Sequence, residues 1–170
     1  MTLPPCAGVP ELLLRPVAPE DKDALVAGLG RLSERSVYQR FLAPKPRLTT
    51  SELRYLTEVD LVDHYALVAV LARCPDVLVG VGRWVRDTEN DAEAEIAIVI
   101  ADDLQGRGVG TMLGAALAQA ARDRGIERFT ASMLPTNRAA HRLFAKISSQ
   151  MQLTRRAGVD ELVATLRAAA

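Results

Sequence analysis

The stretch that most constrains the fold is residues 93–124, EAEIAIVIADDLQGRGVGTMLGAALAQAARDR. An apolar strand over residues 96–100 leads through Asp102 and Asp103 into the glycine-rich segment QGRGVG. Residues 111–124 are rich in Ala, Leu and Met, which favour a helix. The start of a helix leaves its first N–H groups unpaired, and glycine lets them approach an anion closely. The sequence therefore predicts a strand, a glycine elbow and a helix that bind a phosphate group.

The length and charge of the chain indicate how many domains it has and which partners are expected. A chain of 170 residues suits one domain, and we expect a leader over residues 1–10, which hold three prolines, and one folded domain over residues 11–170. The chain has 21 basic and 21 acidic residues, so no overall field favours nucleic acid or an anionic membrane as a partner. No apolar run is long enough to span a bilayer, and the N-terminus does not resemble a signal peptide. We therefore expect a cytoplasmic protein.

Cysteine and histidine are scarce. Cys6 and Cys74 form no CxxC motif, and we expect both to be reduced thiols. His64 and His141 are the only histidines, which excludes a multi-histidine metal site, and we expect no metal.

Hydrophobic periodicity predicts the order of the elements. Strands are expected over residues 11–17, 64–72, 77–86, 96–100 and 128–133, with a turn at Pro75-Asp76 and a closing hairpin of residues 151–155 and 161–167. Helices are expected over residues 20–32, 33–41, 49–59, 111–124 and 138–147, the third opened by a capping box from Thr49 to Glu52. This order predicts an α/β (α+β) domain, a mixed sheet with helices on both faces and βαβ connections only in the second half.

Two other phosphate-binding patterns do not fit the elbow. A P-loop requires Gly-Lys followed by Ser or Thr, and the chain has no Gly-Lys pair. A dinucleotide-binding fold requires G-x-G-x-x-G, but counting from Gly106 the last position is Thr111. Neither nucleotide class is expected.

A third pattern fits. Gln105, Gly108 and Gly110 match Gln/Arg-x-x-Gly-x-Gly/Ala, and Asn137-Arg138 follows downstream. With these motifs the chain resembles the GNAT (Gcn5-related) N-acetyltransferases over about residues 13–147. The segments AEIAIVIADDLQGRGVG and LSERSVYQRF resemble the catalytic domain of bacterial protein lysine acetyltransferases. The resemblance implies a single-domain, mostly antiparallel sheet of six to seven strands, and acetyl-CoA as co-substrate.

Acetyl transfer to an amine requires a base, and the resemblance implies that Glu95 supplies it. Alternation along the strand puts Ile96, Ile98 and Ile100 on one face and Glu95 on the other. We expect Glu95 to lie among small apolar neighbours in a sheet covered on both sides, where a carboxylate holds a proton more readily. Glu93 shares its face and could take the role instead, or neither residue could.

The resemblance also implies a set of residues that bind acetyl-CoA. The backbone at the end of the strand would bind the pantetheine arm as an added strand would, the amides of the elbow would hold the pyrophosphate, and Asn137 would contact the pantetheine. The cofactor-binding residues are then Ile98, Val99, Ile100, Gln105, Gly106, Arg107, Gly108, Val109, Gly110, Thr111 and Asn137. The alternatives are a solvated loop position for Arg107 and an ordinary helix N-cap for Asn137.

One departure from the family concerns the general acid. Many members have a tyrosine where this chain has Phe144, so the acid would be another residue, a water molecule or none. The resemblance implies an amine acceptor, with a protein lysine as the first hypothesis. A small-molecule amine acetyltransferase and a non-catalytic acyl-CoA-binding sensor module stay open. The protein could be a monomer or a homodimer.

Overall fold

The computed structural model describes residues 11–168 and contains seven strands and five α-helices in that range. The strands are β1 (Leu12–Pro16), β2 (His64–Leu71), β3 (Cys74–Arg86), β4 (Glu93–Ile100), β5 (Arg128–Met133), β6 (Ser148–Arg156) and β7 (Val159–Leu166). The helices are α1 (Lys22–Arg31), α2 (Glu34–Phe41), α3 (Thr50–Thr57), α4 (Val109–Arg122) and α5 (Arg138–Ile147). Two short 3-10 turns, η1 (Pro19–Asp21) and η2 (Asp102–Leu104), precede α1 and α4.

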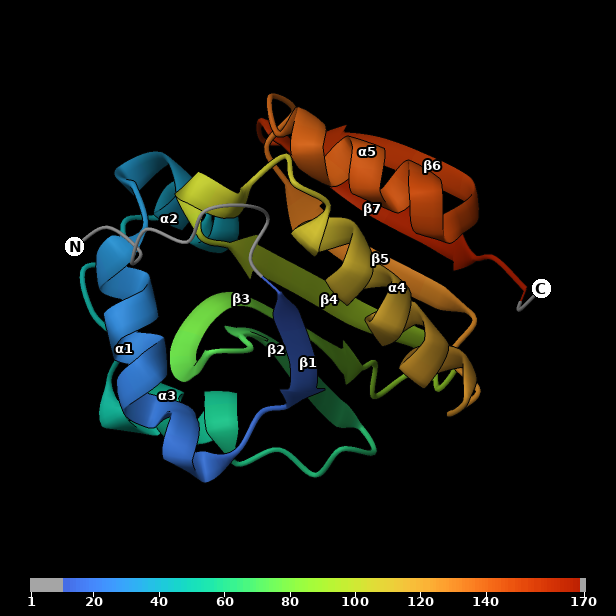
Figure 1. Cartoon of the computed structure of the whole chain (residues 1–170). Helices are drawn as coiled ribbons and strands as arrows, with labels where there is room; N and C mark the ends of the chain where they lie inside the picture. The colour runs from blue at the N-terminus through green and yellow to red at the C-terminus, as the bar shows by residue number, and fades with distance from the viewer. Residues whose placement is uncertain (1–10, 169–170) are drawn as a thin grey trace.

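All seven strands form one sheet in the order β1-β2-β3-β4-β5-β7-β6 (Figure 1). Within the described residues, β4 and β5 are the one parallel pair, and the other neighbours are antiparallel. Because α4 connects β4 to β5, the chain makes its βαβ connection in the second half, as expected. The prediction of a mixed, mostly antiparallel sheet in a single α/β domain is confirmed.

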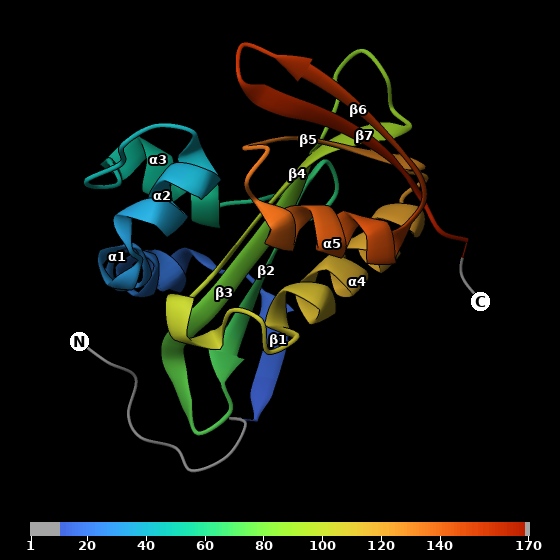
Figure 2. The ribbon, with the colours of Figure 1, turned by 90° about the horizontal axis from the view of Figure 1, so that it is seen from above.

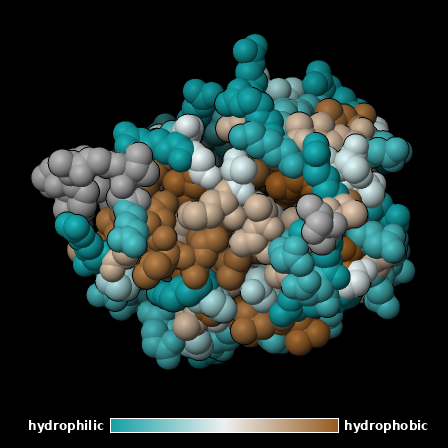
Figure 3. Space-filling model, turned by 45° about the vertical axis from the view of Figure 1, so that its right-hand side comes forward, coloured by the Kyte–Doolittle hydropathy of each residue, from teal (hydrophilic) through white to brown (hydrophobic). Residues whose placement is uncertain are grey.

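Helices cover both faces of the sheet (Figure 2). The larger apolar core lies between the sheet and α4 and α5, and it includes the fully buried Trp84, Leu117 and Phe129. A smaller core, with Leu25 and Val68, lies on the opposite face, where α1, α2 and α3 pack. Apolar surface also gathers in the middle of one side of the molecule and is surrounded by hydrophilic side chains (Figure 3).

A gap between β4 and β5 is the feature of the sheet that positions the site. The two strands pair only from Glu93 opposite Arg128 to Glu95 opposite Thr130. Beyond Glu95, β4 keeps its pairing with β3, and β5 keeps its pairing with β7 as far as Met133. Over residues 96–100, the edge of β4 that faces β5 therefore pairs with no strand of residues 11–168.

Local signals in the sequence located most elements well. The structure has β5 and α5 at the predicted residues, and Thr49 forms the predicted capping box. The Thr49 hydroxyl accepts from the N–H of Glu52 at 3.3 Å, and the Glu52 carboxylate accepts from the N–H of Thr49 at 2.8 Å. This reciprocal pair is a purely local interaction, which is why the sequence predicts it.

Several predicted boundaries were wrong; for example, β4 begins at Glu93 and not at residue 96, and β6 begins at Ser148 and not at residue 151. Two of the differences have a local cause. The turn before β3 lies at Ala72-Arg73, and Pro75 and Asp76 belong to the strand. Residues 75–77 of β3 have no paired residue in β2, and this irregularity in the ladder tolerates a residue without an N–H. Helix α4 begins at Val109, two residues earlier than predicted, because Gly108 already serves as its N-cap.

Some expectations fall on parts of the chain beyond this description. The predicted leader and Cys6 lie outside the described residues, while Cys74 is exposed at the start of β3. Among the described residues, no helix is both long and apolar enough to cross a membrane.

Candidate active site

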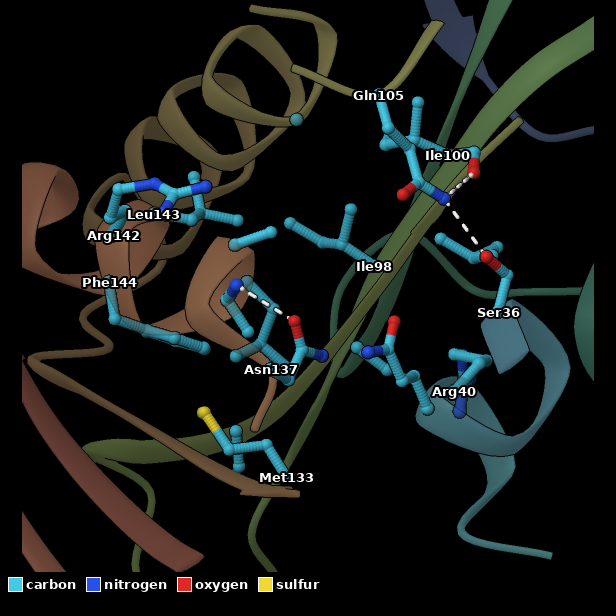
Figure 4. A pocket seen from close by; sticks show the side chains of 18 of the residues that line it. Ser36, Arg40, Ile98, Ile100, Gln105, Met133, Asn137, Arg142, Leu143 and Phe144 are labelled. Carbon is cyan, nitrogen blue, oxygen red and sulfur yellow. Dashed lines mark hydrogen bonds between the residues drawn. The ribbon is translucent and has the colours of Figure 1, made fainter. Parts of the chain in front are cut away.

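A cavity of about 510 Å³ lies beside β4. Figure 4 shows α2 contributing Ser36 and Arg40 to one wall, and α5 contributing Leu143 and Phe144 to the opposite wall. The cavity follows the gap between β4 and β5 and reaches the elbow before α4. Ten of the twelve residues predicted to form the site line it: Glu95, Ile98, Val99, Ile100, Gln105, Gly106, Gly108, Gly110, Thr111 and Asn137.

The elbow has the backbone conformation that its glycines permit. Gly106 has φ of +75° and Gly108 has φ of +89°, in the left-handed region that costs residues with a Cβ roughly 1–2 kcal/mol. Gly108 caps α4 without a side chain, so no capping side chain occupies the first N–H groups of the helix. Gly110 and Thr111 in that first turn line the cavity. A backbone of this shape suits an anion such as a phosphate.

Two residues of the elbow segment point elsewhere. The side chain of Val109 is buried in the main core, and Arg107 is exposed on the loop. Neither residue lines the cavity. The prediction that Arg107 and Val109 contact the ligand therefore depends on their backbone N–H groups or on a reorientation of Arg107.

A hydrogen-bond network joins the elbow to α2. The Gln105 side-chain amide donates to the Ile100 carbonyl at 3.1 Å and to the Ser36 hydroxyl at 3.0 Å. The Asp102 carboxylate accepts from the Ser33 N–H at 2.7 Å and from the Ser36 hydroxyl at 2.5 Å. Burial opposes the ionisation of Asp102, but these hydrogen bonds outweigh it and hold the pKa of its carboxyl below its usual value. The loop after β4 thus fixes the helix that forms the facing wall.

Glu95 lines the cavity, but its surroundings differ from the prediction. We expected a carboxylate enclosed by small apolar neighbours, and the side chain is instead exposed. The reason is that α2 stands farther along the strand, where Ala97 and Val99 lie beneath Arg40 and Phe41 in a second, smaller cavity.

Glu93, the alternative candidate for the base, forms an ion pair with Arg128. Glu93 accepts a hydrogen bond from Arg128 Nε at 2.8 Å and does not line the cavity. Of the two acids on this face of β4, only Glu95 is available at the cavity.

Asn137 is the N-cap of α5 and also lies at the cavity. Its Oδ1 accepts from the N–H of Ala140 at 3.1 Å, so it is the N-cap of α5. The residue also lines the cavity, on the side opposite α2 (Figure 4). The N-cap interpretation is confirmed, and contact with a ligand stays compatible with it.

The aromatic residues leave no tyrosine at the cavity. Phe144, which has no hydroxyl, is nearly fully buried and lines it. Tyr65 stacks on Trp84 on the α4 side of the sheet, with 5.5 Å between ring centroids. Tyr38 and Tyr55 are exposed and do not line the cavity either.

Sequence reasoning missed the residues of α2. Ser36 and Arg40 line the cavity but were not predicted as site residues. They are four residues apart in a helix that was predicted over residues 33–41, so they share one face. That spacing is the signal that could have identified them, although nothing in the sequence says which face meets the site.

The family follows from comparison with known proteins. The family model described as "Acetyltransferase (GNAT) domain" matches residues 11–149, which is most of the chain. The chain belongs to the GNAT acetyltransferases. This membership agrees with the seven-stranded sheet, the elbow between β4 and α4 and the cavity along the β4–β5 gap.

Relatives within the GNAT acetyltransferases include bacterial proteins named Pat. The chain is 35% identical over 136 residues to Acetyltransferase Pat of Mycolicibacterium smegmatis; this covers 80% of the chain and 40% of that protein, so the chain spans less than half of its relative. The GNAT domain of S. lividans PAT has a TM-score of 0.80 and 33% identity, with 90% of this chain and 89% of that one covered. A phosphinothricin acetyltransferase from Sinorhizobium meliloti, solved in complex with AcCoA, has a TM-score of 0.75 over 91% of this chain and 88% of its own. At 15% identity, that likeness shows the fold alone.

Proposed function

We propose that this GNAT domain transfers the acetyl group of acetyl-CoA to a lysine side chain of a protein, with Glu95 as the general base. The observation that carries the proposal is the cavity along the unpaired edge of β4, which has the glycine elbow at one end and Glu95 farther along the same strand. The relatives named Acetyltransferase Pat and S. lividans PAT support acetyl transfer. The resemblance of AEIAIVIADDLQGRGVG and LSERSVYQRF to bacterial protein lysine acetyltransferases favours a lysine acceptor.

The shape of the cavity suits acetyl-CoA. The elbow offers the N–H groups of α4 to a pyrophosphate, where the helix dipole also favours negative charge. The free edge of β4 at Ile98 and Ile100 can bind an extended amide chain in the way that a strand binds its neighbour. The pantetheine arm of CoA is such a chain, and Asn137 lies on the opposite side of its path.

The amine requires help to become a nucleophile. A lysine with a pKa near 10.4 is neutral in about one molecule per thousand at pH 7.4, which adds roughly 4 kcal/mol to the barrier. A carboxylate that accepts the ammonium proton, directly or through one water molecule, removes this handicap. Glu95 is exposed at the cavity and can perform this step.

The leaving thiolate needs less help. A thiol with a pKa of about 8.5 leaves without a proton donor at a useful rate. The phenylalanine at position 144 and the absence of tyrosine from the cavity wall are therefore compatible with turnover.

The test compares two acids of β4. Acetyl-CoA is offered to a lysine-bearing protein, and released thiol is measured for the native chain, Glu95→Gln and Glu93→Gln. Removing a general base lowers kcat by about 10²–10⁴-fold, so we expect a loss in this range for Glu95→Gln, with acetyl-CoA affinity unchanged. Glu93→Gln is the matched control and should keep most of its activity, since Glu93 pairs with Arg128 outside the cavity.

The outcomes separate the competing functions. Full activity of Glu95→Gln would overturn its role as base. Acetylation of small amines but of no protein would show a small-molecule enzyme. Tight binding of acetyl-CoA without thiol release with any acceptor would show a sensor module, and failure to bind acetyl-CoA would overturn the whole proposal.

A further inference from the structure

Two arginines lie next to the cavity on the side of α2. Arg40 lines both the main cavity and the adjoining one, which has a volume of about 80 Å³ and lies beneath α1, α2 and α3. Arg83, from the middle of β3, lines the smaller cavity and is only 5% exposed. Arg83 is thus buried in the smaller cavity, and the partly buried Arg40 lies at the border between the two cavities.

Neither arginine has a carboxylate partner among residues 11–168. Arg83 contacts the His64 Nε2 atom at 3.0 Å and donates to the Leu56 carbonyl at 3.1 Å. Burial, and then the charge of Arg83, lower the pKa of His64 to about 4, so this ring is neutral. Within the described part of the chain, Arg40 donates no hydrogen bond and lies over the ring of Phe41, 5.0 Å from its centroid.

Several other arginines form ion pairs with carboxylates. Arg15 contacts Asp21 at 2.7 Å, Arg86 contacts Asp63 at 2.7 Å, and Arg128 contacts Glu93 at 2.8 Å. Arg31, Arg124 and Arg167 donate instead to backbone carbonyls. What distinguishes the pair beside the cavity is that two arginines lie close enough to repel each other and that, among the described residues, Arg40 donates no hydrogen bond.

The pair is electrostatically unbalanced. Burial lowers the pKa of Arg40, opposed by the charges of Glu95 and Tyr55. Burial, followed by repulsion from Arg40, lowers the pKa of Arg83 to about 10. A buried charge is costly unless an opposite charge and hydrogen bonds compensate it. A carboxylate bound between these two groups would supply both.

The register of the sheet relates the pair to the reacting end of the site. Arg83 lies opposite Ala97, and Glu95 is two residues before Ala97 on the same face of β4. Such diagonal neighbours are about 7–8 Å apart. A molecule whose amine meets Glu95 can therefore reach Arg40 and Arg83 with a second group that lies close to the amine in space.

We propose that the acceptor of this site carries a carboxylate close to its amine, and that Arg40 and Arg83 bind that carboxylate. The inference rests on the proposed function for the position of the amine, and it adds the charge of the acceptor. The carboxylate could come from an acidic side chain beside a protein lysine or from the α-carboxylate of a free amino acid. Both sources present the same group to the arginines.

The first experiment measures acceptor preference. Two lysine peptides, identical except for Glu or Gln beside the lysine, are compared, and so are free lysine and lysinamide. If the arginines bind a carboxylate, the acceptor that carries it should be preferred over its uncharged counterpart. One hydrogen bond to a charged group corresponds to about a tenfold difference in kcat/KM, which we expect for the Glu peptide over the Gln peptide or for free lysine over lysinamide. Arg40→Gln should reduce this preference to within about twofold through KM, and Arg40→Lys should restore part of it. Arg35→Gln, on the exposed side of α2 and outside both cavities, is the matched control.

The second experiment does not depend on acetylation. Binding of glutarate and of its uncharged diamide is measured by calorimetry with CoA present. We expect glutarate to bind the native protein and Arg35→Gln equally, and Arg40→Gln about tenfold more weakly, with no binding of the diamide. Equal binding of glutarate to the native protein and Arg40→Gln, or none to either, would overturn the inference. If neither peptide is acetylated but glutarate binds as expected, the protein-lysine function fails and the carboxylate site stands.

Discussion

The elbow before α4 and the wall formed by α2 close the same cavity, but they are built by different means. The elbow presents backbone groups, held in place by the left-handed conformations of Gly106 and Gly108. The side near α2 presents side chains: Arg40 of α2 and Glu95 of β4 line the cavity, and Arg83 of β3 lines the smaller cavity beside it. The first construction is sensitive to backbone geometry, whereas the second is sensitive to charge. Substitutions that change only one of these properties should therefore affect only one side of the site.

The largest expected effect is that of Gly108→Val. The valine would have to adopt φ near +89°, and its side chain would stand where the N–H groups of α4 meet the ligand. We expect acetyl-CoA affinity to fall by at least about 100-fold, measured by calorimetry, because the backbone can no longer approach the pyrophosphate.

Gly125→Val provides the control for Gly108→Val. Gly125 also has a positive φ, +78°, and a Cβ at either position would meet nothing within 4 Å. Both variants should lose a similar part of their free energy of unfolding, but Gly125→Val should bind acetyl-CoA as the native protein does. Unchanged affinity in Gly108→Val would mean that the elbow does not hold the ligand.

A smaller effect is expected from Asp102→Ala, which tests the link between the two sides. Asp102 belongs to the turn that leads into the elbow, yet its carboxylate binds Ser33 and Ser36 at the start of α2. Loss of a capping interaction costs about 1 kcal/mol of unfolding free energy, which urea titration can measure. We also expect a higher KM for the acceptor, since α2 carries Arg40.

Asp103→Ala is the matched control for this link. Asp103 is the exposed neighbour of Asp102 and accepts no side-chain hydrogen bond from the described residues. This variant should match the native protein in both measurements. Equal behaviour of the two variants would show that the elbow and α2 are independent.

An effect confined to acidic pH is expected at His64, on the face of the sheet that carries α1, α2 and α3. The pKa of His64 is lowered from 6.5 to about 4, first by burial and then by Arg83. Between these values the unfolded chain binds more protons than the folded one, so the free energy of unfolding falls as the pH falls from 6.5 to 4. In His64→Gln, the decrease in the free energy of unfolding between pH 6.5 and 4 should be smaller, because the contribution of His64 is removed. Above pH 7, the free energy of unfolding should depend on pH in the same way in both proteins. Identical slopes in urea titrations across that range would contradict the buried, neutral state of His64.

The same contrast explains what the sequence could predict. The strand, glycines and helix of the elbow are contiguous, and the caps at Thr49 and Asn137 are local, so short-range patterns were sufficient to predict them. The meeting of Arg40 with Arg83 depends on how α2 packs across the sheet, and no local pattern encodes that. The exposure of Glu95 was mispredicted for the same reason, because alternation gives the face of a strand but not how far a helix extends along it.

The gap between β4 and β5 also has a mechanical consequence. β4 pairs with β5 only from Glu93 to Glu95, so the sheet has two parts. One part contains β1, β2, β3 and β4, the other contains β5, β7 and β6, and α4 connects them. A ligand lying in that gap would act as a temporary eighth strand between the two parts of the sheet. Hydrogen bonds from such a ligand would protect the exposed edge of β4, so we expect slower amide exchange there when the ligand is bound.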